Sequence, residues 1–365
     1  MFARKVILLS IMKKQFLFPL ILLSLTSVIA TGCQQKDKRI RLSFGSYVAT
    51  GMIDISYEKF VEKMDAGENM VVVTYDSIFS IDCSCWNGFK AIVDKYVDDN
   101  DLVIYQIDRN EFAGKEDYGL TLLKENSNPT CFVASHGKVT NEYRAGSKNN
   151  EAIFTTEKGF ASALNKIVKE PQVMLVDRTY LRNAIDSGEK VIVYQARAKC
   201  GDCNYCTPNC LLPYSESNEM KTKVLLMDLQ VPGIYYDDQL NKNDATYNAY
   251  KAEYQMTEET NAKYGYSTGV VPTFQVWQNK ELKDACVYFN DSIGKNDNDK
   301  LVVTETYYTK ERVNNLAYTN TILQGMEINP EEATEYPGYG FFWSQEGAAK
   351  YHNEILKSFL NYYTK

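Results

Sequence analysis

Histidine and positive charge are both scarce in this chain. Its 365 residues include two histidines, and 40 lysines and arginines against 47 aspartates and glutamates, which gives a formal net charge of −7. A zinc site built from histidines is disfavoured because such a site needs several imidazole ligands. Binding to nucleic acid is disfavoured as well, because it normally requires a basic face that meets the phosphates. We therefore expect no nucleic-acid partner and no metal site.

Long apolar segments are nearly absent too. The one marked run, residues 16–30, is shorter than the ~20 residues that a membrane-spanning helix needs. It follows Lys13 and Lys14 and ends in small residues before Cys33, after which the chain turns polar. A basic start followed by a short apolar run is typical of a signal peptide. The small residues before the cysteine resemble a bacterial lipoprotein signal.

This resemblance implies that residues 1–32 are removed as a signal peptide and that Cys33 carries a lipid. The protein would then be anchored to the membrane through that lipid, on the extracytoplasmic face. A plain signal peptide or an uncleaved anchor is the alternative, and it also places the chain outside the cytoplasm. Disulfides persist in that environment, so the other eight of the nine cysteines are candidates for disulfide chemistry.

The remainder of the chain alternates strands with helices, and it does so twice. Continuous apolar, β-branched runs predict strands buried on both faces, and apolar residues at helical spacing predict helices. In the first half we expect strands over residues 70–75, 102–107, 131–135 and 139–144, with helices over 56–67, 88–96, 118–124 and 157–169. In the second half we expect strands over residues 191–195, 224–228, 274–277 and 283–289, with helices over 178–186 and 345–363.

Strands that alternate with helices and then end in a hairpin predict an α/β fold. Each of two domains should have a mixed central sheet flanked by helices. The boundary between the domains falls near Pro171. We expect the lipidated cysteine and a short linker over residues 33–45, a first domain over residues 46–170 and a second domain over residues 171–365.

The second half carries a cysteine motif directly after a predicted strand. Its strand at residues 191–195 runs into a C-G-D-C motif from Cys200 to Cys203, and Pro208 follows five residues after the second cysteine. Thioredoxins likewise have a strand, a C-x-x-C motif at a helix start and a proline at that spacing. Downstream, Pro272 stands where the family has a cis-proline before a strand. The resemblance covers about residues 178–290 and the terminal helix, with insertions near residues 234–259 and 291–344.

The resemblance implies a thioredoxin-like fold and thiol–disulfide chemistry. A cysteine at a helix N-terminus faces unpaired N–H groups and the positive end of the helix dipole, which stabilise the thiolate. Cys200 is then the attacking nucleophile, and Cys203, one turn further on, resolves the mixed disulfide. Pro272 belongs to the loop that meets the substrate. No dissociable cofactor is expected, because the dithiol itself carries the electrons.

Three positions depart from the family pattern. Lys199 replaces the tryptophan before the first cysteine, and Asp202 replaces the proline between the cysteines. Lys199 should favour the thiolate of Cys200 and Asp202 should oppose it, and the sequence leaves the balance open. Tyr194 stands where the family has a buried acid, so proton transfer at the site is expected to differ.

Cys206 and Cys210 extend the motif to C-x2-C-x2-C-x3-C, the spacing of bacterial ferredoxins. In those proteins a proline follows the fourth cysteine, whereas Leu211 follows Cys210 here, and the sequence has no second set of cysteines. An iron–sulfur cluster and a zinc site on four thiolates are therefore weaker alternatives. Cys206 and Cys210 are instead expected to be core thiols or a second disulfide, and Cys286 a buried thiol on a strand.

The first half resembles a more divergent thioredoxin fold over about residues 57–169. It has Cys83 and Cys85 in a C-x-C arrangement, and Pro129 is a candidate cis-proline before a strand. A bond between Cys83 and Cys85 would close a small, strained ring, which makes a disulfide more oxidising. This pair is a candidate second redox site. Alternatively, either cysteine pairs with Cys131 in a structural disulfide.

The sequence therefore predicts an extracytoplasmic, lipid-anchored thiol–disulfide oxidoreductase with two thioredoxin-like domains. Its partners would be the thiols and disulfides of exported proteins, together with a redox partner that recycles the dithiol. The competing interpretation is a non-catalytic cell-surface binding or accessory module in which the cysteines form structural disulfides.

Overall fold

The computed structural model describes residues 37–78, 84–121, 129–257, 271–287, 292–295, 301–305 and 356–365. The chain divides into two units, residues 1–39 and residues 40–365, and the helices and strands given below belong to the second. The signal peptide and Cys33 lie outside the described residues. Within the described ranges, no helix combines the length and apolar character that a membrane crossing requires.

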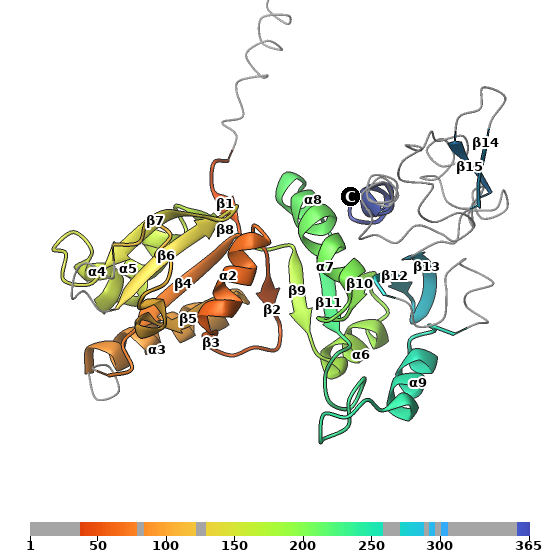
Figure 1. Cartoon of the computed structure of the whole chain (residues 1–365), viewed down its shortest axis with the longest axis horizontal. Coiled ribbons are helices and arrows are strands. Elements are labelled where there is room, and N and C mark those ends of the chain that lie inside the picture. Colours follow the sequence, from red (N-terminus) through yellow and green to blue (C-terminus); the bar gives the residue numbers. More distant parts are fainter. Residues whose placement is uncertain are drawn as a thin grey trace, which may run out of the picture. The chain divides into compact units, whose positions relative to one another are not determined.

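A five-stranded sheet forms in the first half, with the order β3-β5-β4-β6-β7 (Figure 1). Strands β3, β5 and β4 run parallel, β6 is antiparallel to β4, and β7 is antiparallel to β6. The strands are β3 (Ile53–Asp54), β4 (Met70–Tyr75), β5 (Ile104–Asp108), β6 (Thr130–Ser135) and β7 (Lys138–Arg144). The helices are α2 (Tyr57–Asp65), α3 (Ser84–Asn100), the 3-10 helix η1 (Arg109–Phe112), α4 (Glu151–Thr155) and α5 (Glu157–Leu164).

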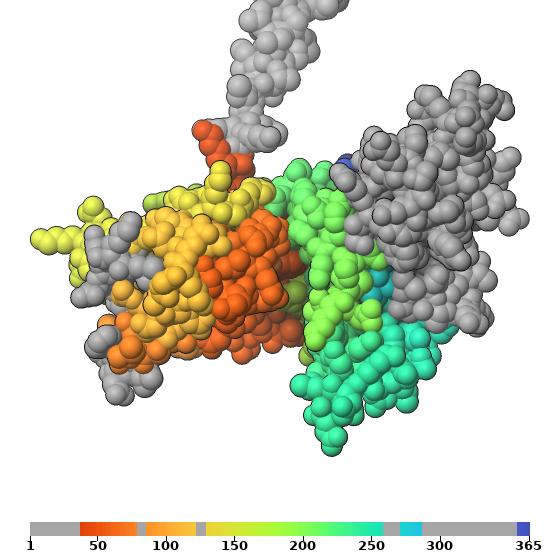
Figure 2. Space-filling view, in the orientation of Figure 1, coloured from red at the N-terminus to blue at the C-terminus, as the bar shows by residue number. Residues whose placement is uncertain are grey.

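The central strand β4 is continuously apolar because helices cover both faces of this sheet. Val71 and Val73 belong to a buried cluster that includes Phe160 of α5. Val72 belongs to a separate cluster with Phe60 of α2, since successive side chains of a strand alternate between the two faces. In the space-filling view, the orange segment that contains α2 lies at the surface of the first half (Figure 2).

The second sheet has six strands, in the order β13-β12-β10-β11-β9-β2. Strands β10, β11, β9 and β2 run parallel, β12 is antiparallel to β10, and β13 is antiparallel to β12. The strands are β2 (Gly45–Ser46), β9 (Val173–Val176), β10 (Val191–Ala196), β11 (Val224–Asp228), β12 (Thr273–Gln278) and β13 (Glu281–Val287). The helices are α6 (Arg178–Asp186), α7 (Gly201–Cys206), α8 (Leu212–Ser217), α9 (Asp244–Glu253) and a terminal helix over residues 356–363, the described part of the one expected over 345–363.

Both sheets share one core arrangement. The central strand, β4 or β10, is followed by a helix and lies beside the parallel strand that comes next in the chain. On its other side lies an antiparallel strand that turns into an edge strand through a hairpin. This strand order, with these directions and connections, is that of the thioredoxin fold. The predicted fold class, mixed sheets flanked by helices, is confirmed.

Part of the segment predicted to be a linker is strand. β1 (Ile40–Arg41) pairs in parallel with β8 (Val168–Lys169), and β2 pairs with β9 at the edge of the second sheet. These pairings join residues far apart in the chain. Strands of two residues also leave no periodic pattern that a sequence analysis can detect.

Two predicted helices differ from the structure. The helix expected over residues 118–124 is wrong in its described part, because Tyr118 and Gly119 have φ angles of 49° and 78°, outside the right-handed helical region. The helix expected over residues 157–169 ends at Leu164, and residues 168–169 form β8 instead. At residues 118–119 the local backbone conformation overrides the helical pattern. At residues 168–169 the pairing with a distant strand overrides it.

The first predicted insertion contains a helix of the core. α9 lies within residues 234–259, and its Tyr250 is fully buried. The Tyr250 hydroxyl donates a hydrogen bond to Oε1 of Gln195 on β10 at 2.7 Å, so this helix is packed onto the sheet and is not peripheral. In the second predicted insertion, the described residues form an antiparallel pair, β14 (Ser292–Lys295) and β15 (Leu301–Glu305).

The packing of α2 predicts a large effect of truncating Phe60. This ring is fully buried, and its centroid lies 5.5 Å from that of Phe112 and 5.9 Å from that of Phe132. Phe60→Ala should lower the free energy of unfolding by about 3–5 kcal/mol. Leu240→Ala, at a side chain that is 66% exposed, is the control and should change it by only about 0.5 kcal/mol. Urea denaturation followed by circular dichroism measures both, and equal effects would contradict this packing.

Candidate active site

Cys200 is the N-terminal cap of α7. Strand β10 ends at Ala196, a short loop follows, and the backbone of Cys200 is extended, with φ −102° and ψ 119°. Its Sγ accepts a hydrogen bond from the backbone N–H of Cys203 at 3.4 Å. The sulfur therefore takes the place that a side-chain oxygen has in an ordinary N-cap, at the positive end of the helix.

The helix that carries the two cysteines changes its geometry after one and a half turns. α7 ends at Cys206, and a π-helical segment, Thr207–Leu211, connects it to α8. Pro208 lies in this segment, and proline has no N–H to donate while its ring crowds the preceding turn. Regular α-helical hydrogen bonding is interrupted there. Cys200 and Cys203 therefore lie in a short helical segment directly after the loop that follows β10.

The loop before β12 meets Cys200. The peptide bond between Val271 and Pro272 is cis, and Cys200 Sγ lies 3.4 Å from the Val271 carbonyl oxygen, to which it donates a hydrogen bond when Cys200 is a thiol. β12 is the antiparallel neighbour of β10, with Tyr194 opposite Phe274. The end of β10 and the start of β12 therefore lie side by side. The structure brings together Cys200, Cys203 and Pro272, the three residues that the sequence analysis singled out in this half.

The two cysteines of the motif have opposite pKa shifts. The hydrogen bonds from Cys203 lower the pKa of Cys200 to about 6, with a further contribution from the positive charge of Arg197, against the effects of burial and of Asp202. Burial raises the pKa of Cys203 far above its usual range, and the hydrogen bond and negative charge of Cys200 raise it further. At neutral pH the pair is thus one thiolate, at Cys200, and one thiol, at Cys203.

Arg197 is a site residue that the sequence analysis missed. Its guanidinium lies over the ring of Tyr235, 5.0 Å from the centroid, and its Nε is buried without a hydrogen-bond partner among the described residues. Lys199, the cation that the sequence favoured, is exposed. Spacing alone could not distinguish the two, because both precede Cys200 by a few residues and only the loop conformation decides which one faces the sulfur.

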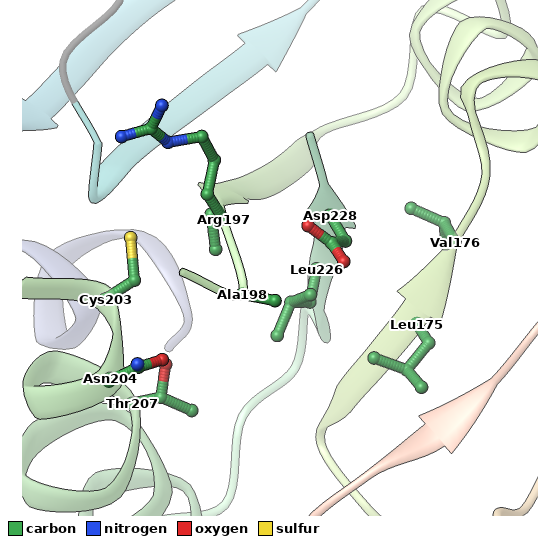
Figure 3. A pocket seen from close by; sticks show the side chains of 10 residues that line it. Leu175, Val176, Arg197, Ala198, Cys203, Asn204, Thr207, Leu226 and Asp228 are labelled. Carbon is green, nitrogen blue, oxygen red and sulfur yellow. The ribbon is translucent and has the colours of Figure 1, made fainter. Parts of the chain in front are cut away.

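A cavity of about 320 Å³ opens behind the motif and contains a second missed residue, Asp228. Cys203 of α7 lies on one side of the cavity and Asp228, the last residue of β11, on the other (Figure 3). Burial raises the pKa of Asp228, against the backbone hydrogen bonds from Gln230 and Ala198. The sequence signal that could have found Asp228 is its position at the carboxyl end of a predicted parallel strand, where ligands and functional groups often lie in α/β sheets.

Tyr194 is a neutral phenol in the core of the second sheet. It is fully buried, stacks on Phe274 with a centroid distance of 4.4 Å, and shares a hydrogen bond of 2.8 Å with the Thr207 hydroxyl. Burial raises its pKa well above the usual value, and the nearby cysteines add to the shift. It therefore keeps its proton near neutral pH.

The other cysteines of the second half lie in the core. Cys206, Cys210 and Cys286 are fully buried thiols, and none of them is part of a disulfide. Burial raises the pKa of Cys206 well above its usual value. Within the residues that the structure describes, no group of three or more histidine, cysteine or acidic side chains is arranged to hold a metal ion. The second disulfide that the sequence left open is not formed.

In the first half, Cys85 is exposed at the start of α3 and is disulfide-bonded. Cys83, its predicted partner, lies outside the described residues. Cys131 is a fully buried thiol on β6, and burial raises its pKa to about 12. The alternative pairing of Cys131 with Cys83 or Cys85 is therefore wrong. Pro129 directly precedes β6, and the peptide bond before it involves Asn128, which lies outside the described residues.

No family model matches the sequence, and no curated protein matches it. Among solved structures, the chain is similar to the zinc-bound form of human ERp44, with 11% identity, a TM-score of 0.23, and coverage of 49% of this chain and 45% of that chain. It is also similar to a mutant thioredoxin from Halobacterium salinarum, with 11% identity, a TM-score of 0.24, and coverage of 33% of this chain and 96% of that chain. A thioredoxin from Trypanosoma brucei brucei matches with 15% identity, a TM-score of 0.23 and the same two coverages.

The chain thus spans less than half the length of ERp44. Matches with such identities and TM-scores carry no information on activity. The thioredoxin-like fold of this protein instead follows from the strand order, directions and connections of its two sheets.

The geometry predicts an unusually acidic Cys200, to which the charge of Arg197 contributes. The rate of alkylation of Cys200 by iodoacetamide should rise with pH through a midpoint of about 6, because the thiolate is the reactive form, and not through the ordinary value near 9. Arg197→Gln should raise this midpoint, since it removes the cation that favours the thiolate. Mass spectrometry of the alkylated peptide measures both.

Lys199→Gln is the matched control for Arg197→Gln. It removes the same charge two positions away, from an exposed side chain, and should leave the midpoint nearly unchanged. A larger shift in Lys199→Gln than in Arg197→Gln would mean that the sequence-based choice of cation was right and the geometric one wrong.

Proposed function

We propose that this protein is a thiol–disulfide oxidoreductase in which Cys200 is the nucleophile and Cys203 the resolving thiol. The observation that carries the proposal is the position of Cys200 Sγ, which lies at the N-terminus of α7 and is in contact with both the Cys203 N–H and the Val271 carbonyl oxygen. A low-pKa thiolate beside a second thiol on the same helical turn is suited to disulfide exchange.

The reaction transfers two electrons between the dithiol and a disulfide. In the reducing direction, the Cys200 thiolate attacks a substrate disulfide, a mixed disulfide forms, and one substrate sulfur leaves as thiolate. Cys203 then attacks Cys200 Sγ, the Cys200–Cys203 bond forms, and the second substrate sulfur leaves. The oxidising direction runs the same steps backwards. The dithiol holds the electrons throughout, so the proposal requires no dissociable cofactor.

The Val271–Pro272 loop is the proposed substrate-binding element. Its carbonyl already contacts Cys200, and an extended substrate chain can bond to backbone groups at the same place. Such recognition reads the substrate backbone and not particular side chains. It suits the broad substrate class that we propose, which is exported proteins with exposed thiols or disulfides.

The disulfide at Cys85 supports a second redox site in the first half. α3 follows β4 as α7 follows β10, so Cys85 lies at the place on its sheet that the C-G-D-C motif has on the other. Its exposure makes it accessible to a thiol partner. We propose that Cys83 is the other half of this disulfide and that Pro129 belongs to the loop facing it.

The proposed location is the extracytoplasmic face of the membrane, with a lipid on Cys33. This part of the proposal is supported by the sequence of residues 13–39 alone. A membrane-anchored oxidoreductase also needs a redox partner that restores its dithiol or disulfide after each cycle, because one turnover leaves the pair in the opposite state.

Three variants of the mature protein test the proposed reaction. In Cys203→Ser the Cys200 thiolate should attack disulfide-containing partners and accumulate mixed disulfides, because nothing resolves them, and Cys200→Ser should form none. Cys206→Ala is the control, since it removes a buried thiol of the same helical segment, and it should cycle like the wild type. Non-reducing electrophoresis with mass spectrometry identifies the trapped species.

A redox titration of the wild type separates this proposal from a non-catalytic binding module. The Cys200–Cys203 bond should form and open reversibly between about −120 and −270 mV. A bond that resists reduction below about −300 mV, or that never forms, would indicate structural cysteines and a binding or accessory role.

The proposed anchor predicts a lipid on Cys33. Metabolic labelling with a fatty acid should label the wild type, and Cys33→Ala should lose the label because it removes the acceptor thiol. Mass spectrometry of the mature N-terminus provides the second measurement. A mature chain that begins elsewhere and carries no lipid would leave a plain signal peptide as the explanation of residues 1–32.

A further inference from the structure

The resolving step that we propose requires a base. Cys203 attacks as a thiolate, but only 3% of its surface is exposed, and burial keeps it protonated. Its proton must move to another group as the sulfur attacks. Water alone is a weak base, so the acceptor should be an ionisable group of the surrounding structure.

Most ionisable groups around Cys203 cannot accept that proton. Tyr194 and Cys206 are buried and have pKa values raised well above their usual ranges, so they already hold protons. Arg197 is a cation without an acceptor atom. Asp202 is the neighbour of Cys203 in the chain and does not line the cavity behind it. The ionisable groups around Cys203 are Tyr194, Arg197, Cys200, Cys206, Asp228 and Tyr247. Burial raises the pKa of Tyr247 as well, so it keeps its proton, and Cys200 is bonded to the substrate in this step.

Asp228 remains, and the fold holds it at the same cavity. It ends β11 and lies opposite Ala196, the last residue of β10, in the parallel register of the two strands. Its carboxylate accepts a backbone hydrogen bond from Gln230 at 2.8 Å, which fixes its orientation. Cys203 and Asp228 both line the cavity, each from a different element (Figure 3).

The cavity is large enough for water to connect the two groups. A volume of about 320 Å³ corresponds to on the order of ten water molecules at ~30 Å³ each. Thr207 and Asn204 also line it, and their polar groups give such waters hydrogen-bond partners. Proton transfer over a short water chain needs no direct contact between sulfur and carboxylate.

We propose that Asp228 is the proton acceptor for Cys203, through water in this cavity, in the step that resolves the mixed disulfide. The inference rests on the oxidoreductase function proposed above. The S–H proton of Cys203 passes to the Asp228 carboxylate, the Cys203 sulfur bonds to Cys200 Sγ, and the bond from Cys200 to the substrate breaks with departure of the substrate thiolate. In the oxidising direction, protonated Asp228 returns the proton to Cys203 as it leaves.

The electrostatics of Asp228 suit this role. Burial raises its pKa above the ordinary value of a carboxyl, and a carboxylate with a higher pKa is a stronger base. The resolving step should therefore slow as the pH falls through this raised pKa, because protonated Asp228 has no site for another proton.

Two kinetic phases separate the steps in the mature wild-type protein. Reduced protein is mixed with Ellman's reagent, a small aromatic disulfide that absorbs when cleaved. Attack by Cys200 releases the first thionitrobenzoate ion, and attack by Cys203 on the mixed disulfide releases the second. Asp228→Asn keeps the shape of the side chain but removes the base, so it should slow the second phase by about tenfold or more at pH 7. It should also abolish the acid limb, which is the decrease of the second-phase rate as the pH falls. The first phase should be unchanged.

Asp108→Asn is the matched control, because Asp108 ends β5 as Asp228 ends β11. It should leave both phases unchanged. Asp228→Glu, which keeps a carboxylate beside the cavity, should recover most of the second phase with an acid limb. If Asp228→Asn loses the first phase as well, that variant has lost the folded site. Asp228→Glu with an intact first phase then shows, by the presence or absence of an acid limb, whether the carboxylate at position 228 is the base.

The outcomes distinguish this inference from the function on which it rests. A wild type that releases only one thionitrobenzoate has no resolving Cys203, and the oxidoreductase proposal fails. A wild type with both phases, and a second phase that slows by less than tenfold in Asp228→Asn or equally in Asp108→Asn, overturns the role of Asp228 alone. A second phase without an acid limb in Asp228→Glu overturns it as well.

Discussion

The antiparallel pairing of β10 with β12 is the constraint on which the candidate site depends. Its register places Tyr194 opposite Phe274 and Gln195 opposite Thr273, and the two rings stack with an angle of 3° between their planes. A shift of one residue would turn the side chains of one strand to the opposite face. The buried aromatic pair thus fixes the point at which the chain leaving β10 meets the chain entering β12, and Val271 reaches Cys200 for that reason.

A second level of organisation lies within a single helical turn. Cys200 and Cys203 have the same side chain, yet one caps a helix and the other is enclosed within it. Backbone N–H groups stabilise charge on the first sulfur, whereas lack of water destabilises charge on the second. Asp202 between them acts against the thiolate, so this motif is less strongly biased than one with a neutral residue there. The hydrogen bonds from Cys203 outweigh Asp202, and the charge of Arg197 in the preceding loop offsets part of its effect.

Much of this arrangement could be predicted from the sequence. The runs at 70–75, 191–195 and 224–228 became central strands because each starts with consecutive apolar residues, which is typical of a strand buried on both faces. The C-G-D-C motif after such a strand located Cys200 and Cys203, and the later proline located the loop that meets them. Arg197 and Asp228 could not be found this way, since each contributes through the direction of its side chain in a folded loop or at a strand end.

Secondary structure was missed for a similar reason. Tyr118 and Gly119 adopt left-handed backbone angles that the apolar spacing of residues 118–124 does not signal, and residues 168–169 are strand only because Ile40 and Arg41 pair with them. α9, within the insertion predicted near 234–259, is anchored to Gln195 in the core through Tyr250, a contact that the sequence pattern does not signal. Each error concerns information that lies elsewhere in the chain or in a single φ angle.

The pairing of β2 with β9 has a consequence for the order of assembly. Gly45 pairs with Met174 and Ser46 with Leu175. β2 is therefore synthesised before the whole sequence of the first sheet, and its partner β9 is synthesised after that sequence. Long-range pairings of this kind form late, because the intervening chain has to be ordered first. The edge strand β2 is therefore synthesised early but paired late. A nascent chain stalled before residue 173 would carry β2 as an unpaired strand.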